Sequence, residues 1–315
     1  MLRFVKFLRS YLSQGMDVEC KEGRKTVDQQ KKGILLSVLT SATGISYFCN
    51  KNMLFFLNVE TSALLWFSLG SVFYLLFLLP SSRRRDIETI WKNIRKILVV
   101  AFFTGIGAIF WFEGTRLAQP TNVAFIFQFS RVFIALAGVI LLREKLSLRE
   151  GTGVLLALIG GFFLTCSGGV LKIIGNLILF TSAFFYAIAH ILVKIYIEDV
   201  GPIPMAAGRT MLVALILFIY SIMLGRLNLQ VPIEAFSWAL LGAFTAPFLA
   251  VISYYEALKR IEISKAAAIL STQPFFTTLY ASLFFSTFPS PFELLGGTIV
   301  TLGVMILALS SRKKN

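Results

Sequence analysis

One arginine, Arg131, stands near the middle of the apolar run 120–142, with Gln128 and Ser130 close to it in the chain. A run of this length is what a helix needs to cross a hydrocarbon core of ~30 Å. A guanidinium at the bilayer centre costs about 2.5–3.5 kcal/mol on insertion scales, so it normally faces a partner or a wet cavity. Because its planar donor fork recognises carboxylate or phosphate, we predict that Arg131, Gln128 and Ser130 bind an anionic substrate. A structural ion pair or a hydrogen-bond post between helices is the alternative.

A second polar segment, Ser271, Thr272 and Gln273, precedes Pro274 in another apolar run. Proline removes a backbone donor and leaves a carbonyl without its helical partner. In a bilayer that carbonyl must be satisfied by another group or face water. The interpretation is that Ser271 and Gln273 face the Arg131 segment across a cavity, and a kink with hydrogen-bonded contacts between helices is the alternative.

Aromatic residues near these segments could form an apolar or stacking wall of the same cavity. Trp111 and Tyr255 are the predicted members, with Phe127, Phe129 and Tyr254 as further candidates. Most of the 31 phenylalanines are expected to serve packing instead.

Two further sets of candidate residues lie inside the apolar runs, one at each end of the predicted helices. The inner set is His190, Arg209 and Glu256, and the outer set is Tyr47, Trp66 and Glu113. These sets predict two gates that close alternately, and the alternative is that Glu256 only neutralises Arg209. Glu113 has Arg116 or the deeper Arg131 as its candidate partner. Since protonation of a carboxylate would release its partner, a proton is a candidate coupling ion.

The composition is that of a membrane protein. Of 315 residues, 57% are hydrophobic and only 15% charged, whereas soluble domains carry about 25% charged residues. The net charge of +14 comes from basic residues between the apolar runs and at the chain ends, without a basic-aromatic surface, so no nucleic-acid partner is expected. The partners predicted are the lipid bilayer and a small-molecule substrate, with a homodimer as an open alternative.

Cysteine and histidine usage predicts no metal site and no cofactor. The chain has one histidine and three cysteines, Cys20, Cys49 and Cys166, at spacings that suit neither a metal site nor a disulfide framework. Cys49 and Cys166 are predicted near one membrane face, so a bridge between them is the alternative to two free thiols. The chain contains no ATP-binding loop, which disfavours primary transport by this polypeptide alone.

Ten apolar runs follow a basic segment and predict an all-α integral membrane fold with ten transmembrane helices. The runs are 33–50, 61–80, 97–117, 120–142, 151–170, 173–193, 204–224, 236–257, 266–287 and 294–311. With the N-terminus inside, the predicted cytoplasmic segments hold 24 of the 30 Lys and Arg residues and the outer loops 4. This bias predicts a multi-pass protein of the cell (inner) membrane with both termini cytoplasmic.

Residues 1–32 form the predicted cytoplasmic basic N-terminal segment, and 312–315 a short cytoplasmic tail. In the first twelve residues the basic positions Arg3, Lys6 and Arg9 are three apart and the apolar positions lie on another side, which suits a short helix lying on an anionic membrane surface. A disordered tail, or an upstream start codon with Met16 as the true first residue, is the alternative.

The two halves of the chain, 33–170 and 171–311, resemble each other at a constant offset of 143 positions. This shift superposes Lys51 on Lys194, Glu113 on Glu256, Gly153 on Gly296 and Gly160 on Gly303. Because each half holds five predicted helices, an odd number, the second copy must be inserted upside down. Two inverted five-helix repeats are typical of secondary transporters with a site near the midplane. The paired glycines are interpreted as packing positions.

The five-plus-five arrangement, with REKLSLREGTGVLLALIGGFFL (143–164) and SPFELLGGTIVTLGVMIL (290–307) closing the repeats, resembles the drug/metabolite transporter superfamily and its EamA branch. The resemblance covers residues 33–311. It implies alternating access through a cavity lined by the third, fourth, eighth and ninth helices. Two positions depart from the pattern: Arg131 stands where a second proline would match Pro274, and Thr287 stands where an acid would match Glu144.

These observations predict a secondary transporter, a permease or exporter, and not an enzyme. The expected substrate is a small organic metabolite with an anionic group, such as an amino acid or related carboxylate. Nucleotide-like or cofactor-like metabolites are the alternative within this class. A membrane-embedded enzyme acting on lipid-linked substrates is the alternative from another class, and it would need catalytic groups clustered at one interface.

Overall fold

The computed structural model describes residues 27–80, 83–142, 148–166, 170–261, 263–285 and 288–310. Most of the predicted N-terminal segment, the predicted tail, Glu144 and Thr287 therefore lie outside the described residues. Regular structure within the described ranges is entirely helical.

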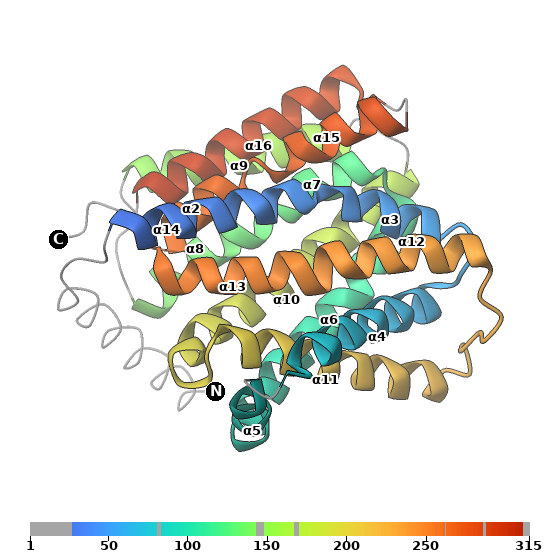
Figure 1. Ribbon diagram of the computed structural model, residues 1–315. Helices are drawn as coiled ribbons and strands as arrows, with labels where there is room; N and C mark the ends of the chain where they lie inside the picture. The colour runs from blue at the N-terminus through green and yellow to red at the C-terminus, as the bar shows by residue number, and fades with distance from the viewer. Residues whose placement is uncertain are drawn as a thin grey trace.

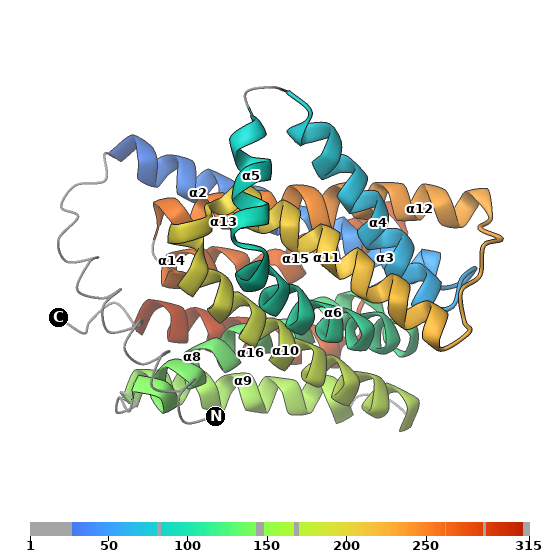
Figure 2. The same cartoon turned by 90° about the horizontal axis from the view of Figure 1, so that it is seen from below.

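The helices pack side by side as one bundle (Figure 1). In the first half they are α2 (Val27–Ala42), η1 (Thr43–Ile45), α3 (Ser46–Met53), α4 (Val59–Leu78), α5 (Arg84–Lys92), α6 (Ile94–Leu117), α7 (Pro120–Phe127), α8 (Phe129–Leu142) and α9 (Leu148–Cys166). In the second they are α10 (Val170–Val200), α11 (Pro202–Met223), α12 (Ile233–Ala243), the π-helical η3 (Phe244–Ala250), α13 (Val251–Arg260), α14 (Ile263–Leu270), α15 (Gln273–Phe284) and α16 (Pro291–Ser310). The short α5 runs across the direction of the long helices (Figure 2).

Among the described residues, seven continuous helical stretches are long and apolar enough to cross a membrane. The outside of the bundle is apolar too. On α4, for example, Val72, Leu75, Leu76 and Leu79 share one face and are 47–73% exposed. Since soluble monomers rarely leave such patches uncovered, this surface fits contact with lipid. The all-α membrane class is thus confirmed, while the ten-span count stays a prediction.

The predicted fourth and ninth helices are each interrupted, a feature that the apolar runs did not indicate. The fourth divides into α7 and α8 at Gln128, and the ninth divides into α14 and α15 at Ser271–Thr272. At both interruptions a backbone amide donates to the carbonyl oxygen three residues earlier, and not four as in an α-helix. These hydrogen bonds run from Gln128 N to Phe125 O (3.1 Å) and from Thr272 N to Ile269 O (3.1 Å). Gln128 and Ser271 are 143 positions apart, so the two interruptions obey the offset of the sequence.

The sixth helix is longer than predicted. Its apolar run ends near residue 193, which placed Lys194 in a connection, but α10 continues to Val200. Gly201 then reverses the chain at φ +81°, a conformation that glycine adopts without steric cost. Pro202 begins α11 immediately afterwards. Lys194 is therefore a helical residue.

Helices α9 and α16 meet along the four paired glycines and form what we call the glycine seam. A Cβ built on Gly160 would lie 2.5 Å from the carbonyl oxygen of Gly296 and 2.6 Å from the amide nitrogen of Val300. A Cβ on Gly153 would lie 2.8 Å from the carbonyl oxygen of Gly303. These contacts are to backbone, so no side-chain rotation can make room. The packing role predicted for these glycines is confirmed.

Replacing Gly160 with alanine is expected to destabilise the protein by about 1–3 kcal/mol, since overpacking forces the two helices apart. Gly151 on the same helix supplies the matched control, because its Cβ would meet nothing within 4 Å. Thermal unfolding of both variants in detergent measures the difference. Equal melting temperatures for Gly160→Ala and Gly151→Ala would show that α9 and α16 can move apart at the glycine seam without loss of stability.

Candidate substrate site

Arg131 lies one turn beyond the interruption between α7 and α8. Its Nη1 donates a hydrogen bond to Oε1 of Gln128, and the Ser130 hydroxyl donates to the carbonyl oxygen of Phe127 at 2.9 Å. Gln128 and Ser130 are buried, whereas Arg131 keeps part of its surface accessible. The structure thus brings these three predicted site residues together at the helix interruption.

Among the described residues, the guanidinium of Arg131 has no carboxylate within ion-pair distance. The alternative of a structural ion pair therefore finds no partner in the described part of the chain.

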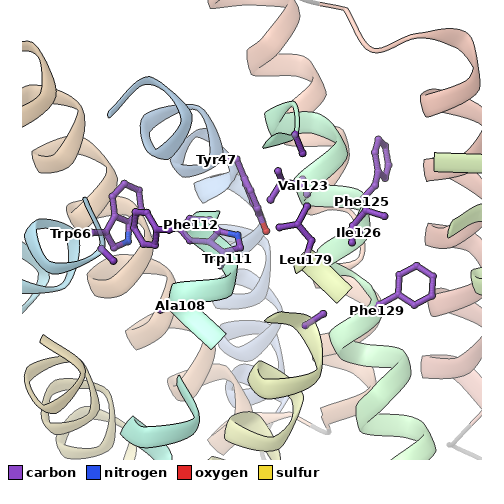
Figure 3. Packing of buried hydrophobic residues seen from close by; sticks show 14 of the residues in the cluster. Tyr47, Trp66, Ala108, Trp111, Phe112, Val123, Phe125, Ile126, Phe129 and Leu179 are labelled. Carbon is purple, nitrogen blue, oxygen red and sulfur yellow. The ribbon is translucent and has the colours of Figure 1, made fainter. Parts of the chain in front are cut away.

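Four buried aromatic residues, Tyr47, Trp66, Trp111 and Phe112, form one cluster, here the aromatic tetrad. Trp111 is at its centre, with ring centroids 5.9 Å from Tyr47, 5.9 Å from Trp66 and 5.1 Å from Phe112. Figure 3 shows the Tyr47 ring directed toward Trp111, with Trp66 and Phe112 on the other side. The tetrad joins α3, α4 and α6.

A second cluster, the polar tetrad, consists of His190, Arg209, Tyr254 and Tyr255 on α10, α11 and α13. Nη1 of Arg209 donates to the Tyr255 hydroxyl at 3.0 Å, and its guanidinium lies 5.6 Å from the same ring. The His190 ring is 5.4 Å from that of Tyr254, which is 6.0 Å from that of Tyr255. Arg209 is only 3% exposed.

The two tetrads have the same internal arrangement. Each member of the polar tetrad stands 143 positions after a member of the aromatic one: Tyr47 with His190, Trp66 with Arg209, Trp111 with Tyr254 and Phe112 with Tyr255. The separation of 5.9 Å in the Tyr47–Trp111 pair corresponds to 5.4 Å in the His190–Tyr254 pair. Likewise, 5.9 Å in the Trp66–Phe112 pair corresponds to 5.6 Å in the Arg209–Tyr255 pair. One packing scheme thus occurs twice, once apolar and once charged.

The two predicted gating carboxylates lie outside these clusters. Glu113 pairs with Arg116, one of its two candidate partners. Glu256 pairs with Arg260 on the same helix, so the alternative in which Glu256 neutralises Arg209 is wrong. The reason is local: a partner four residues away on a helix is within reach near the helix end, without carrying a carboxylate into the interior.

At one end of the bundle, which we call the Arg226 end, contacts that sequence reasoning missed join separate segments of the chain. Arg226 pairs at 2.9 Å with Glu60, a carboxylate whose side chain is only 8% exposed. Lys51 at the end of α3 donates to the carbonyl oxygens of Thr115 (3.1 Å) and Arg116 (2.8 Å) in the last turn of α6. A lysine here satisfies carbonyls that a helix end leaves free.

Ser271 and Gln273 lie at the second interruption, and their described contacts do not reach Arg131. The Ser271 hydroxyl donates to the carbonyl oxygen of Ala268 at 2.6 Å. The two interrupted helices do meet, through the rings of Phe125 and Phe275 at 6.1 Å. Substrate binding by Ser271 and Gln273 stays a prediction.

Sequence reasoning also missed Tyr186, which connects the end of α7 to the polar tetrad. Its ring is 5.1 Å from Phe127 and 6.2 Å from His190. The available signal was its position four residues before His190 on the same helix face. No group of three His, Cys, Asp or Glu side chains that could hold a metal occurs among the described residues.

The bundle of membrane-length helices around buried charged and aromatic clusters defines a multi-pass α-helical membrane protein. The chain belongs to the EamA-like transporter family, which matches residues 31–166 and, a second time, residues 173–309. This family membership makes it a membrane transporter and not an enzyme.

Relatives agree with this membership. An uncharacterized transporter of Methanothermobacter thermautotrophicus is 24% identical over 67% of this chain, and that alignment spans only 63% of the relative's length. The uncharacterized transporter YyaM of Bacillus subtilis is 24% identical over 86% of this chain and 92% of its own. A solved crystal structure matches 91% of this chain and 99% of its own with a TM-score of 0.64, at 16% identity, which shows a shared fold.

Proposed function

We propose that this protein is a secondary transporter that moves a small organic anion by alternating access, with Arg131 holding the anionic group. The observation that carries the proposal is a guanidinium beside a helix interruption, bonded to Gln128 and without a carboxylate among the described residues. Interrupted helices at corresponding positions of two halves are the best pointer to a transporter's binding site. An amino acid or related carboxylate fits this donor set.

The proposal includes ten spans in two inverted repeats. Its support is the double match to the family, the interruptions at Gln128 and Ser271, and the two equivalent tetrads. In this scheme each tetrad closes one side of the site. In this proposal the Arg226 end is outside and both termini are cytoplasmic, and the excess of basic residues in the connections on the other side supports that orientation. Proton coupling and a homodimer stay predictions.

The test is a thermal-shift screen of the full-length protein in detergent against amino acids, monocarboxylates, dicarboxylates, nucleotides and cationic drugs. A ligand that binds only the folded state, at a free concentration of a hundred times its Kd, stabilises that state by about 2.7 kcal/mol. We expect an anion to raise the melting temperature of the wild type and Arg131→Gln to lose that shift. The exposed Lys92→Gln, on α5, is the matched control for loss of one positive charge. Stabilisation by cations alone, or an equal anion shift in Arg131→Gln, would refute the assignment.

A further inference from the structure

A second buried guanidinium, Arg209, has no counterion within the described part of the chain. It is 3% exposed and makes one described hydrogen bond, to the Tyr255 hydroxyl. Its Nε, another donor, finds no partner among the described residues. A buried charge without an anion is costly, and buried charges are normally paired. Arg209 therefore has donors and charge left for a ligand.

No described carboxylate forms an ion pair with Arg131 or Arg209. The acids nearest to the tetrads in the chain already have basic partners: Glu256 has Arg260, and Glu113 has Arg116. Removing a carboxylate from an existing pair to serve a buried arginine would break that pair. Among the described residues, neither Arg131 nor Arg209 therefore has a carboxylate partner.

A series of contacting side chains leads from Arg209 to the segment that precedes Arg131. From Arg209 it runs through Tyr255 and Tyr254 to His190. From His190 it continues through Tyr186 to Phe127, one helical turn before Arg131. His190 lies between the two ends, with its ring against those of Tyr186 and Tyr254. The side chains between Arg209 and the Arg131 segment are therefore all aromatic, and those of Tyr255, Tyr254 and Tyr186 also carry a hydroxyl group.

We propose that the substrate carries two negative charges, one held by Arg131 with Gln128 and the other by Arg209 beside Tyr255. This rests on the proposed function and narrows its substrate class to dianions, either a short dicarboxylate or a phosphate monoester. Each guanidinium can form parallel hydrogen bonds to a carboxylate or phosphate. The surrounding rings of Tyr186 and Tyr254 would pack on the organic part of the substrate.

The experiment compares dissociation constants of the purified full-length protein for succinate and glutarate with those for butyrate and valerate, measured by thermal shift and tryptophan fluorescence. Glycerol phosphate and inorganic phosphate form the second arm. The wild type is expected to bind a dianion at least about tenfold tighter than the matched monoanion, as one charge-assisted hydrogen bond implies. If dicarboxylates bind more tightly than monocarboxylates, the substrate has two separated anionic groups. If glycerol phosphate binds more tightly, the substrate has one doubly charged group. Both support the proposal.

The variants assign each charge. Arg209→Gln should bind the dianion no better than the monoanion, while Arg131→Gln should lose binding of both. A purely structural Arg209 would instead lower the melting temperature without ligand and leave the dianion preference intact. If Arg209→Gln does not purify as a single species, Arg209→Lys decides, because it keeps the charge but loses the fork and should weaken dianion binding alone. Lys92→Gln is the control.

Two negative outcomes are distinguishable. Equal affinity of the wild type for monoanions and dianions would overturn the dianion proposal and leave the proposed function standing. If no anion binds the wild type, and Arg131→Gln has the same ligand response as the wild type, both the dianion proposal and the proposed function are overturned.

Discussion

Replacing Gly242 with leucine is expected to prevent formation of a stable bundle. A Cβ at this position of α12 would lie 2.0 Å and 2.2 Å from two ring carbons of Trp66, and 2.9 Å from Cβ of Cys49. Trp66 is 2% exposed and Cys49 fully buried, so neither can move aside. Overpacking a core by one methyl group costs about 1–3 kcal/mol, and leucine adds three more carbons, so the loss should exceed that range. Size-exclusion chromatography and thermal unfolding in detergent measure the effect.

The control uses the same helix and the same substituent. Ser237 on α12 is exposed, so Ser237→Leu should behave as the wild type. A double variant, Gly242→Ala with Trp66→Phe, tests the cause, since the smaller ring makes room for one methyl group. It should be more stable than Gly242→Ala alone. A Gly242→Leu protein that remains monodisperse with an unchanged melting temperature would contradict this packing.

Substituting Lys51 with glutamine is expected to open the Arg226 end, a prediction that rests on the proposed function. Lys51 joins α3 to the last turn of α6, whereas its counterpart Lys194 has no described hydrogen bond to the corresponding turn of α13. If the halves exchange roles, Lys194 would make that contact only in the opposite state. Removing Lys51 therefore destabilises the state seen here, and Lys194→Gln should favour it.

The reporter is a cysteine at Val123, a fully buried residue of α7 that lies near Tyr47 in Figure 3. The three native cysteines are first replaced by serine or alanine. Labelling by a membrane-impermeant maleimide should be at least about fivefold faster in Lys51→Gln, as loss of ~1 kcal/mol of hydrogen bonding implies. Lys194→Gln should label no faster than its parent. Equal rates in all three proteins would show that Lys51 is only a helix cap.

The sequence alone determined the class of the fold and the family. Whether a segment enters the membrane depends on the transfer free energy of its own residues, which can be read along the chain. The glycine seam was predictable for a related reason, because glycines repeating every seven residues on one helix face serve close packing whichever helix is the partner. The pair of Glu113 and Arg116 could also be predicted from the sequence, because its members are three residues apart on one helix.

Only the tertiary structure decided which buried groups meet. No proline or glycine marks the interruption at Gln128, and no local pattern indicated that Arg209 would lie against Tyr255, 46 positions away in the chain. Partner choice depends on how each helix is rotated about its axis. A helix that is apolar on every face offers little contrast between those faces, so its sequence hardly specifies that rotation. The two uncompensated arginines, and with them the dianion proposal, therefore emerged only once the helices were packed.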